Sequence, residues 1–188
     1  MGISVRDLEF KVLDADYDLS SFQCSNAELK DFLTQDALSN QVARLSVTRL
    51  AFYKGRSVGY FTLVTDVIKK SELDTADGEQ DFRYTTYPAF KIARFATHRE
   101  FERQGVGRAM LLKIFAIWIR LSKHIGCRMI TVDAKPEAVG FYKRFSFHDA
   151  IIDQKKLRGK DTIPLYIDIH RELERIGRSV PLSEFEGR

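Results

Sequence analysis

The stretch FERQGVGRAM (residues 101–110) places two glycines two positions apart at the start of an apolar helical pattern. Glycine is a poor residue for a helix start unless the position needs a backbone without a side chain. The apolar residues that recur at helical spacing here are Val106, Met110, Leu111, Ile114, Trp118 and Leu121. The stretch therefore predicts a tight turn from a strand (89–97) into a long helix that ends near Gly126.

Three kinds of phosphate-binding loop have glycines at such a turn, and two of them are excluded. A P-loop needs a Lys and a hydroxyl residue at a spacing that this chain lacks after Gly107. A dinucleotide fingerprint needs a third glycine where Met110 stands, and an acidic residue near Ile125. In the third kind, backbone N–H groups and the helix N-terminus face one anion, with Arg103 and Arg108 adding contacts. A turn whose glycines only permit close packing stays as the alternative.

Length and composition are those of one globular domain. The chain has 188 residues, of which 44% are hydrophobic and 30% charged. Residues 1–90 carry ten Lys or Arg against 14 Asp or Glu, and residues 91–188 carry 20 against 12. The basic half begins where the glycine stretch begins, which favours an anionic ligand there; a solvated, salt-bridged surface is the alternative.

The sequence also argues against a membrane protein, a secreted protein, a disulfide-rich protein and a metal-binding protein. No apolar run approaches the length of a membrane span, and residues 1–30 lack the apolar core of a signal peptide, so a cytoplasmic protein without membrane contact is expected. Cys24 and Cys127 stand far apart without CxxC spacing. Neither a disulfide framework nor a metal site is predicted.

The remaining patterns predict a mixed α/β sheet with helices packed on it. Ser25 and Glu28 form a capping-box pattern before a helix at about 26–40. The other expected elements are a hairpin of strands 45–53 and 57–65 joined by residues 54–56, strands at 127–134 and 162–170, a helix at 136–145, and a polar tail from about 173. Residues 69–87 are polar, acidic and aperiodic, which is typical of a functional lid or a disordered insertion.

Two motifs resemble the GCN5-related N-acetyltransferase (GNAT) family: IARFATHREFERQGVGRAMLL (92–112) and MITVDAKPEAVGFYKRFSF (129–147). The resemblance implies a single domain over 1–188, with its core at about 5–170. It also implies a mostly antiparallel sheet with helices on both faces and a splayed central strand pair. Residues 17–66 are similar, more weakly, to the branch of toxin acetyltransferases that act on aminoacyl-tRNA.

The resemblance also assigns roles to residues, with acetyl-CoA as co-substrate. The main chain of Phe95, Ala96 and Thr97 would pair with the pantetheine arm. The pyrophosphate cradle would be Arg103, Gln104, Gly105, Val106, Gly107 and Arg108. Tyr142 would be the general acid, with Phe141 and Lys143 close to the cofactor.

Several positions depart from the family pattern. Glu102 stands where Gln or Arg is usual, Ser146 where glycine is usual, and no asparagine follows the strand at 127–134. The strand that ends at Thr97 carries no carboxylate to act as a general base. Glu100 and His98 lie just beyond it, and each is expected to be an exposed loop residue. Arg94 is predicted either to face the acceptor or to pair with an acid on the sheet.

The predicted function is transfer of acetyl from acetyl-CoA to a primary amine by direct attack on the thioester. The absence of an obvious base favours an α-amino acceptor, with a pKa of about 7.7–8.0, over lysine at about 10.4. A toxin-type enzyme acting on aminoacyl-tRNA and a non-catalytic CoA-binding module are the alternatives. Expected partners are a small or amine-bearing substrate, with tRNA, an antitoxin-like protein and a second copy of the chain left open.

Overall fold

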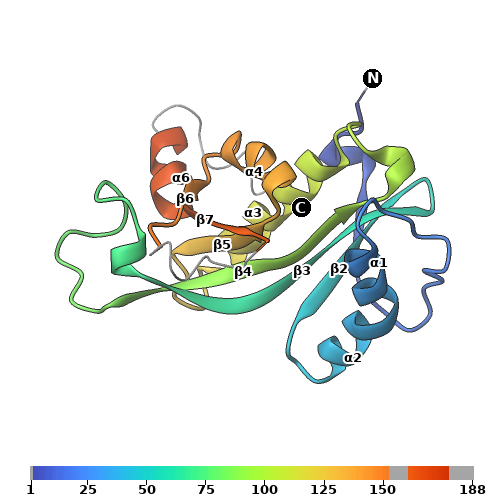
Figure 1. Ribbon diagram of the computed structural model, residues 1–188, viewed down its shortest axis with the longest axis horizontal. Helices are drawn as coiled ribbons and strands as arrows, with labels where there is room; N and C mark the ends of the chain where they lie inside the picture. The colour runs from blue at the N-terminus through green and yellow to red at the C-terminus, as the bar shows by residue number, and fades with distance from the viewer. Residues whose placement is uncertain (1, 153–160, 178–188) are drawn as a thin grey trace. The chain divides into compact units, whose positions relative to one another are not determined.

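The computed structural model describes residues 2–152 and 161–177, and its strands form a seven-stranded sheet in the order β1-β2-β3-β4-β5-β7-β6 (Figure 1). The strands are β1 (Glu9–Val12), β2 (Val47–Tyr53), β3 (Arg56–Lys69), β4 (Thr86–Thr97), β5 (Met129–Ala134), β6 (His148–Asp149) and β7 (Ile163–Asp168). The α-helices are α1 (Ala27–Asp31), α2 (Ala37–Val42), α3 (Val106–Leu121), α4 (Pro136–Lys143) and α6 (Ile169–Gly177). The pairs β1–β2, β2–β3, β5–β7 and β6–β7 are antiparallel, which confirms the predicted mixed α/β class.

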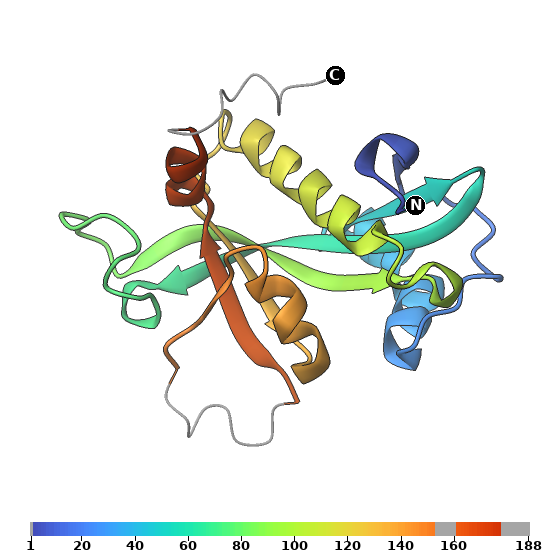
Figure 2. The ribbon, with the colours of Figure 1, turned by 90° about the horizontal axis from the view of Figure 1, so that it is seen from above.

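The chain divides into two compact units. The first comprises Met1–Val64 and Ile92–Ile117, and the second comprises Thr65–Lys91 and Trp118–Arg188. Strands β3 and β4 and helix α3 contribute residues to both units, and Figure 2 shows α3 as one unbroken helix. The predicted splay between the central strands stays a prediction.

In the first unit, helices pack on both faces of the sheet. Tyr60 belongs to the buried cluster that also contains Leu33 and Ala37 from the N-terminal helical segment. Its neighbour Gly59 faces the other way, because a Cβ added there would lie 2.8 Å from the sulfur of Met110 in α3. Since successive strand residues point to opposite faces, the predicted placement of helices on both faces is confirmed within this unit.

The N-terminal helical segment differs from the prediction in its start and its continuity. The N-cap is Asn26, whose side-chain oxygen accepts a hydrogen bond from the backbone N–H of Leu29 (3.2 Å), so the expected cap at Ser25 is wrong. A π-helical turn, η2 (Phe32–Asp36), separates α1 from α2. Periodicity alone could not reveal this turn, because Leu29, Leu33 and Ala37 are each four residues apart, the spacing of an uninterrupted α-helix.

The hairpin between β2 and β3 lies where the sequence placed it. Lys54 and Gly55 have φ of 49° and 78°, the positive values that a tight two-residue hairpin turn requires. Strand β3 extends to Lys69, beyond the predicted end at residue 65.

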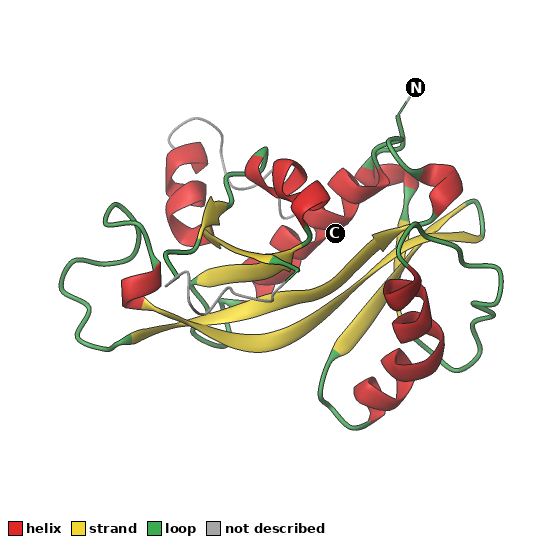
Figure 3. Cartoon of the chain, viewed as in Figure 1, coloured by secondary structure: helices red, strands yellow, loops and turns green. Residues whose placement is uncertain are grey.

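In the second unit, a buried cluster of Ile68, Leu73, Tyr87, Ala89, Met129 and Tyr166 forms the core. The loop predicted over 69–87 is shorter than expected. The 3-10 turn η3 (Lys70–Glu72) and an early start of β4 leave only residues 73–85 irregular (Figure 3).

This β3–β4 loop (residues 73–85) is fastened to β7 and, through Glu79, to Arg128, the residue before β5. The backbone N–H of Asp74 donates to the Tyr166 hydroxyl (2.7 Å), and that of Gly78 donates to the carboxylate of Asp168 (2.9 Å). Arg128 donates to the same carboxylate oxygen (2.8 Å from Nη2). These contacts argue against the freely moving insertion that the loop's composition allowed.

Smaller differences concern two helix ends and two short strands. Helix α3 ends at Leu121, and Gly126 does not have the positive φ expected of a terminating glycine. Helix α6 covers the start of the predicted tail, and the rest of the tail, from residue 178, lies outside the described residues. Strands β1 and β6 were not predicted, because four and two residues are too few for a recognisable pattern.

Among the described residues, no helix has the length and apolar character needed to cross a membrane.

Candidate active site

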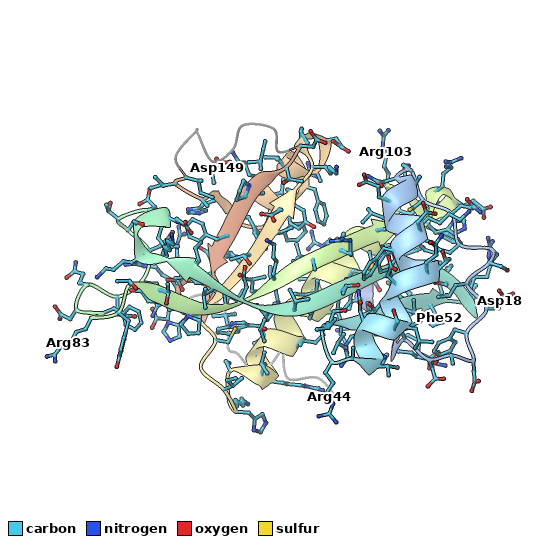
Figure 4. The ribbon with its side chains drawn as sticks, turned by 60° about the horizontal axis from the view of Figure 1, so that its bottom comes forward. Asp18, Arg44, Phe52, Arg83, Arg103 and Asp149 are labelled. Carbon is cyan, nitrogen blue, oxygen red and sulfur yellow. The ribbon has the colours of Figure 1, made fainter. Side chains whose placement is uncertain are left out.

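The glycine stretch forms a turn of unusual backbone conformation between β4 and α3. The 3-10 turn η4 (Arg99–Phe101) follows β4, and then Arg103 and Gly105 have φ of 60° and 98°. Arg103 is exposed on this turn (Figure 4). Backbone turns of this kind, in which right- and left-handed residues follow one another, direct N–H groups toward a common point and bind anions.

Glycine is required at position 105 by contact with another segment of the same chain, and not only by a ligand. A Cβ at this position would collide with the carbonyl oxygen of Ile3, because the N-terminal segment crosses the turn there. The backbone N–H of Ile3 donates to the carbonyl of Gln104 (2.6 Å), which holds the two segments together. Close packing therefore accounts for the absence of a side chain at Gly105, in agreement with the alternative that the glycines permit close packing in the turn.

The same turn leaves the start of α3 available to a ligand. The first helical hydrogen bond runs from the N–H of Ala109 to the carbonyl of Gly105 (3.0 Å). The N–H groups of Val106 and Gly107 precede this bond at the positive end of a 16-residue helix. The same turn therefore allows close packing at Gly105 and also has backbone N–H groups that could bind an anion.

Other cradle side chains have structural roles. The Val106 side chain is buried, and the Gln104 amide donates to the carbonyl of Glu100 (2.6 Å). Glu102, the unusual carboxylate of the stretch, accepts a hydrogen bond from the hydroxyl of Ser25 (2.5 Å). Sequence reasoning missed this role of Ser25, because 77 residues separate the two partners and no local pattern reports such a contact.

The end of β4 presents the segment expected to pair with the cofactor. Ala96 is buried in the core, whereas Phe95 and Thr97 are half-buried. Arg94 is exposed and its guanidinium lies 4.9 Å from the ring centroid of Phe32, a cation–π contact. Among the described residues, Arg94 therefore has an aromatic partner in place of the predicted acid, and the alternative that it faces the acceptor stays a prediction.

Neither candidate base is suited to that role. Arg56 forms an ion pair with Glu100 (2.7 Å), and this hydrogen bond lowers the pKa of the exposed carboxyl, which weakens it as a base. His98 is buried, contrary to the expectation of an exposed loop residue. Its Nδ1 accepts from the N–H of Glu100 (3.2 Å), and its Nε2 lies 3.3 Å from the carbonyl of Ser21. Both ring nitrogens of His98 therefore contact backbone groups, one in the turn and one at Ser21.

Helix α4 of the second unit carries the remaining candidates. Pro136 occupies its first turn, as predicted. Tyr142 is buried, with the rings of Phe141 and Phe147 packed edge-on at 5.1 and 5.3 Å. Burial raises the pKa of the Tyr142 phenol above its usual value, so the group is protonated at neutral pH. Lys143 is exposed and donates to Asp149 (2.6 Å).

The predicted site residues thus fall into two sets. The first unit brings together the β4 end (95–97) and the cradle (103–108), and the second unit contains residues 141–143. Outside both sets, Cys24 and Cys127 are free thiols, and burial raises the pKa of each.

Comparison with known proteins gives a consistent result. A family model described as an acetyltransferase (GNAT) domain matches residues 50–149. A tRNA-acetylating toxin of Mycobacterium tuberculosis is 28% identical over 138 residues, which cover 73% of this chain and 81% of the toxin.

Solved structures are similar over most of their length. AtaT complexed with acetyl-methionyl-tRNAfMet has a TM-score of 0.79 at 22% identity, covering 90% of this chain and 99% of the other. A Tyr-to-Phe variant of the toxin AtaT, bound to the C-terminus of the antitoxin AtaR and acetyl-CoA, has a TM-score of 0.70 at 21% identity, covering 90% and 97%. At these identities, the likeness concerns the fold.

Proposed function

Because this chain belongs to the GNAT family of acetyl-CoA-dependent acetyltransferases, we propose that it acetylates the α-amino group of an aminoacyl-tRNA. The observation that carries the proposal is the similarity to a tRNA-acetylating toxin over 73% of the chain. This acceptor is a special case of the primary amine predicted from the sequence.

Acetyl-CoA, when bound, supplies an activated acetyl carbon and a sulfur leaving group. We assign its pyrophosphate to the turn at 103–108, where the N–H groups of Val106 and Gly107 precede the first helical bond. Arg103 and Arg108 would add charge-assisted contacts. The positive φ values of Arg103 and Gly105 support this assignment, because they shape a turn that suits an anion.

We assign the pantetheine arm to the main chain of Phe95, Ala96 and Thr97, in the manner of an added strand. Phe141 would contact the cofactor from α4. Lys143 would have to leave Asp149, its present partner, before it could bind a phosphate. Its expected contribution to affinity is therefore smaller than that of the backbone groups.

Tyr142 is proposed as the general acid. Burial raises the pKa of this phenol, so it stays protonated through the neutral range. A thioester sulfur is weakly basic and becomes a proton acceptor only as its bond to carbon breaks. The phenol would therefore give up its proton during that step, when the thiolate develops.

Neither candidate base among the described residues is available, which supports an α-amino acceptor. Glu100 is paired with Arg56, and both nitrogens of His98 contact the backbone. An α-amino group, with a pKa of about 7.7–8.0, is partly neutral at pH 7 without help, whereas a lysine at about 10.4 is almost fully charged. A site without a base therefore acts best on the former.

The proposal is tested by acetyl transfer from labelled acetyl-CoA to charged tRNA, deacylated tRNA, spermidine and a lysine peptide. We expect label only in charged tRNA. Tyr142→Phe should lower kcat about 100-fold or more while leaving the thermal shift by acetyl-CoA intact. Tyr17→Phe, which removes a hydroxyl from a ring packed on Phe52, is the matched control. Acetylation of spermidine in preference to charged tRNA would refute the acceptor.

The dependence of kcat/KM on pH gives a second test. With an α-amino acceptor, activity should rise to a plateau above about pH 8 and stay level to pH 10, because the raised pKa of Tyr142 keeps the acid protonated. A rise that continues toward pH 10 would indicate a lysine-like acceptor instead.

An antitoxin-like protein and a second copy of the chain stay as predicted partners.

A further inference from the structure

The second unit contains a hollow beside the β3–β4 loop that no part of the acetyl-transfer site uses. Its volume is about 530 Å³. Its lining consists of basic, aromatic and hydroxyl residues: Lys69, Lys70, Ser71, Phe82, Arg83, Tyr84 and Thr85. No carboxylate belongs to this lining, although residues 69–87 contain five acidic residues against three basic ones.

Three of the five acidic residues have partners in the fold. Asp77 accepts a hydrogen bond from the Tyr166 hydroxyl (2.8 Å), and Glu79 forms an ion pair with Arg128. Glu72 accepts from the backbone N–H of Lys69 (3.3 Å). These three carboxylates are thus engaged in holding the loop, and the hollow receives the positive side chains.

The cations at the hollow differ in their roles. The Lys70 ammonium donates to the carbonyl of Phe82 (3.0 Å) and so shapes the loop while its charge stays at the hollow. Lys69 is exposed. Arg83 extends outward from the loop (Figure 4) and has no ion pair or hydrogen bond within residues 2–152 and 161–177. Its guanidinium is therefore available to an anion.

An aromatic ring is presented beside these charges. Tyr84 is 73% exposed, and its ring lies 5.4 Å from that of Phe82. Phe82 in turn stacks on the buried Tyr87 at 4.2 Å with an interplanar angle of 16°. The exposed ring of Tyr84 thus packs against Phe82, which itself stacks on Tyr87, and Tyr84 directly follows Arg83 in the chain.

We propose that this hollow binds a nucleotide of an unpaired RNA segment, with a base on Tyr84 and a phosphate at Lys69 and Arg83. A positive groove combined with an aromatic stacking surface is the chemistry by which proteins hold single-stranded nucleic acid. The volume lies within the range of small-ligand sites. The choice of RNA over another polyanion with aromatic groups rests on the proposed function.

Fluorescence anisotropy of the full chain with a labelled 12-nucleotide single-stranded RNA tests the proposal. Tyr84→Ala should weaken binding about 5-fold or more, and Tyr84→Phe should bind within about two-fold of the native protein, because the ring is retained. Arg83→Gln should lower the dependence of log K on log salt by about 0.7. Arg44→Gln removes an exposed arginine of the other unit (Figure 4) and should leave that slope unchanged.

Binding by Tyr84→Ala and Arg83→Gln equal to that of Arg44→Gln would overturn the proposal. Equal loss of binding in Tyr84→Ala and Tyr84→Phe would also overturn it, because stacking would not then be the cause. The thermal shift by acetyl-CoA checks that each variant is folded. The oligonucleotide carries no aminoacyl group, so RNA binding is measured independently of acetyl transfer, and either proposal can fail without the other.

Discussion

A single hydrogen bond holds Glu102, the unusual carboxylate of the turn proposed to bind pyrophosphate. A carboxylate within a pyrophosphate cradle would repel its ligand if it pointed inward. The hydroxyl of Ser25 holds it at 2.5 Å, from a segment 77 residues away. The unusual residue is therefore accommodated by a partner outside the motif.

Loss of that partner should weaken acetyl-CoA binding. We expect Ser25→Ala to raise KM for acetyl-CoA about 5-fold with little change in kcat, because a net hydrogen bond contributes about 1 kcal/mol, which corresponds to about 5-fold in an equilibrium constant. The double variant with Glu102→Gln should return toward the native KM. Ser39→Ala, whose hydroxyl donates to the carbonyl of Asp36, is the control. An unchanged KM in Ser25→Ala would show that Glu102 does not need restraint.

Ser146 is a second departure that the structure explains. Its φ is 61°, and the N–H groups of Ser146 and Phe147 donate to the carbonyls of Lys143 (3.2 Å) and Tyr142 (3.3 Å). This is the Schellman pattern of helix termination, in which glycine is preferred. The serine therefore adopts a strained conformation immediately after the helix that carries the proposed acid.

Ser146→Gly should stabilise the protein by about 0.5 kcal/mol, since relief of the left-handed strain exceeds the added chain entropy of glycine. The melting temperature should rise by roughly 1–2 °C. Ser39→Gly, inside α2, should have the opposite effect. A fall in melting temperature for Ser146→Gly would mean that the serine side chain contributes more than its backbone strain costs.

At the scale of elements, contacts between distant segments position the N-terminal helices. The hydroxyl of Tyr60 in β3 donates to the carbonyl of Leu29 (2.5 Å), next to the π-helical turn that carries Phe32. Arg94 of β4 covers the ring of Phe32. The irregular turn thus lies where two strands of the first unit contact the helix, and this location has no signature in local sequence.

The β3–β4 loop depends on one buried charge pair. The Asp168 side chain is 2% exposed, and that of Arg128 is 16% exposed. Arg128→Met should destabilise the protein by about 3 kcal/mol, because a buried carboxylate loses its counter-charge. Chemical denaturation measures this change. Lys11→Met, which breaks an exposed pair with Glu9, should cost less than about 1 kcal/mol; equal effects would contradict the argument from burial.

At the scale of the whole molecule, the two compact units share three elements. Because β3, β4 and α3 contribute to both units, we expect one cooperative unfolding transition, in line with the predicted single domain. Fluorescence of Trp118, the only tryptophan, and far-UV circular dichroism should report the same midpoint. Separate midpoints would show that the units unfold independently.

Local sequence patterns were sufficient to predict many of the helices and strands. Apolar periodicity predicted α3 and α4, alternation and turn residues predicted the β2–β3 hairpin, and Pro136 marked a helix start. Their limits appear where partners are far apart, as for the contact between Ser25 and Glu102 and the burial of His98. Two-residue and four-residue strands were missed because pairing, rather than local pattern, defines them.

The sequence by itself therefore determined the fold class, the glycine turn before α3 and the family, because these depend on local periodicity and on two linear motifs. Only the tertiary structure decided that Gly105 faces the carbonyl of Ile3, that Ser25 restrains Glu102, and that the acidic β3–β4 loop leaves its cations at a hollow. The physical reason is the same in each case. Hydrogen bonds, collisions and ion pairs join residues that the chain brings together only when it is folded.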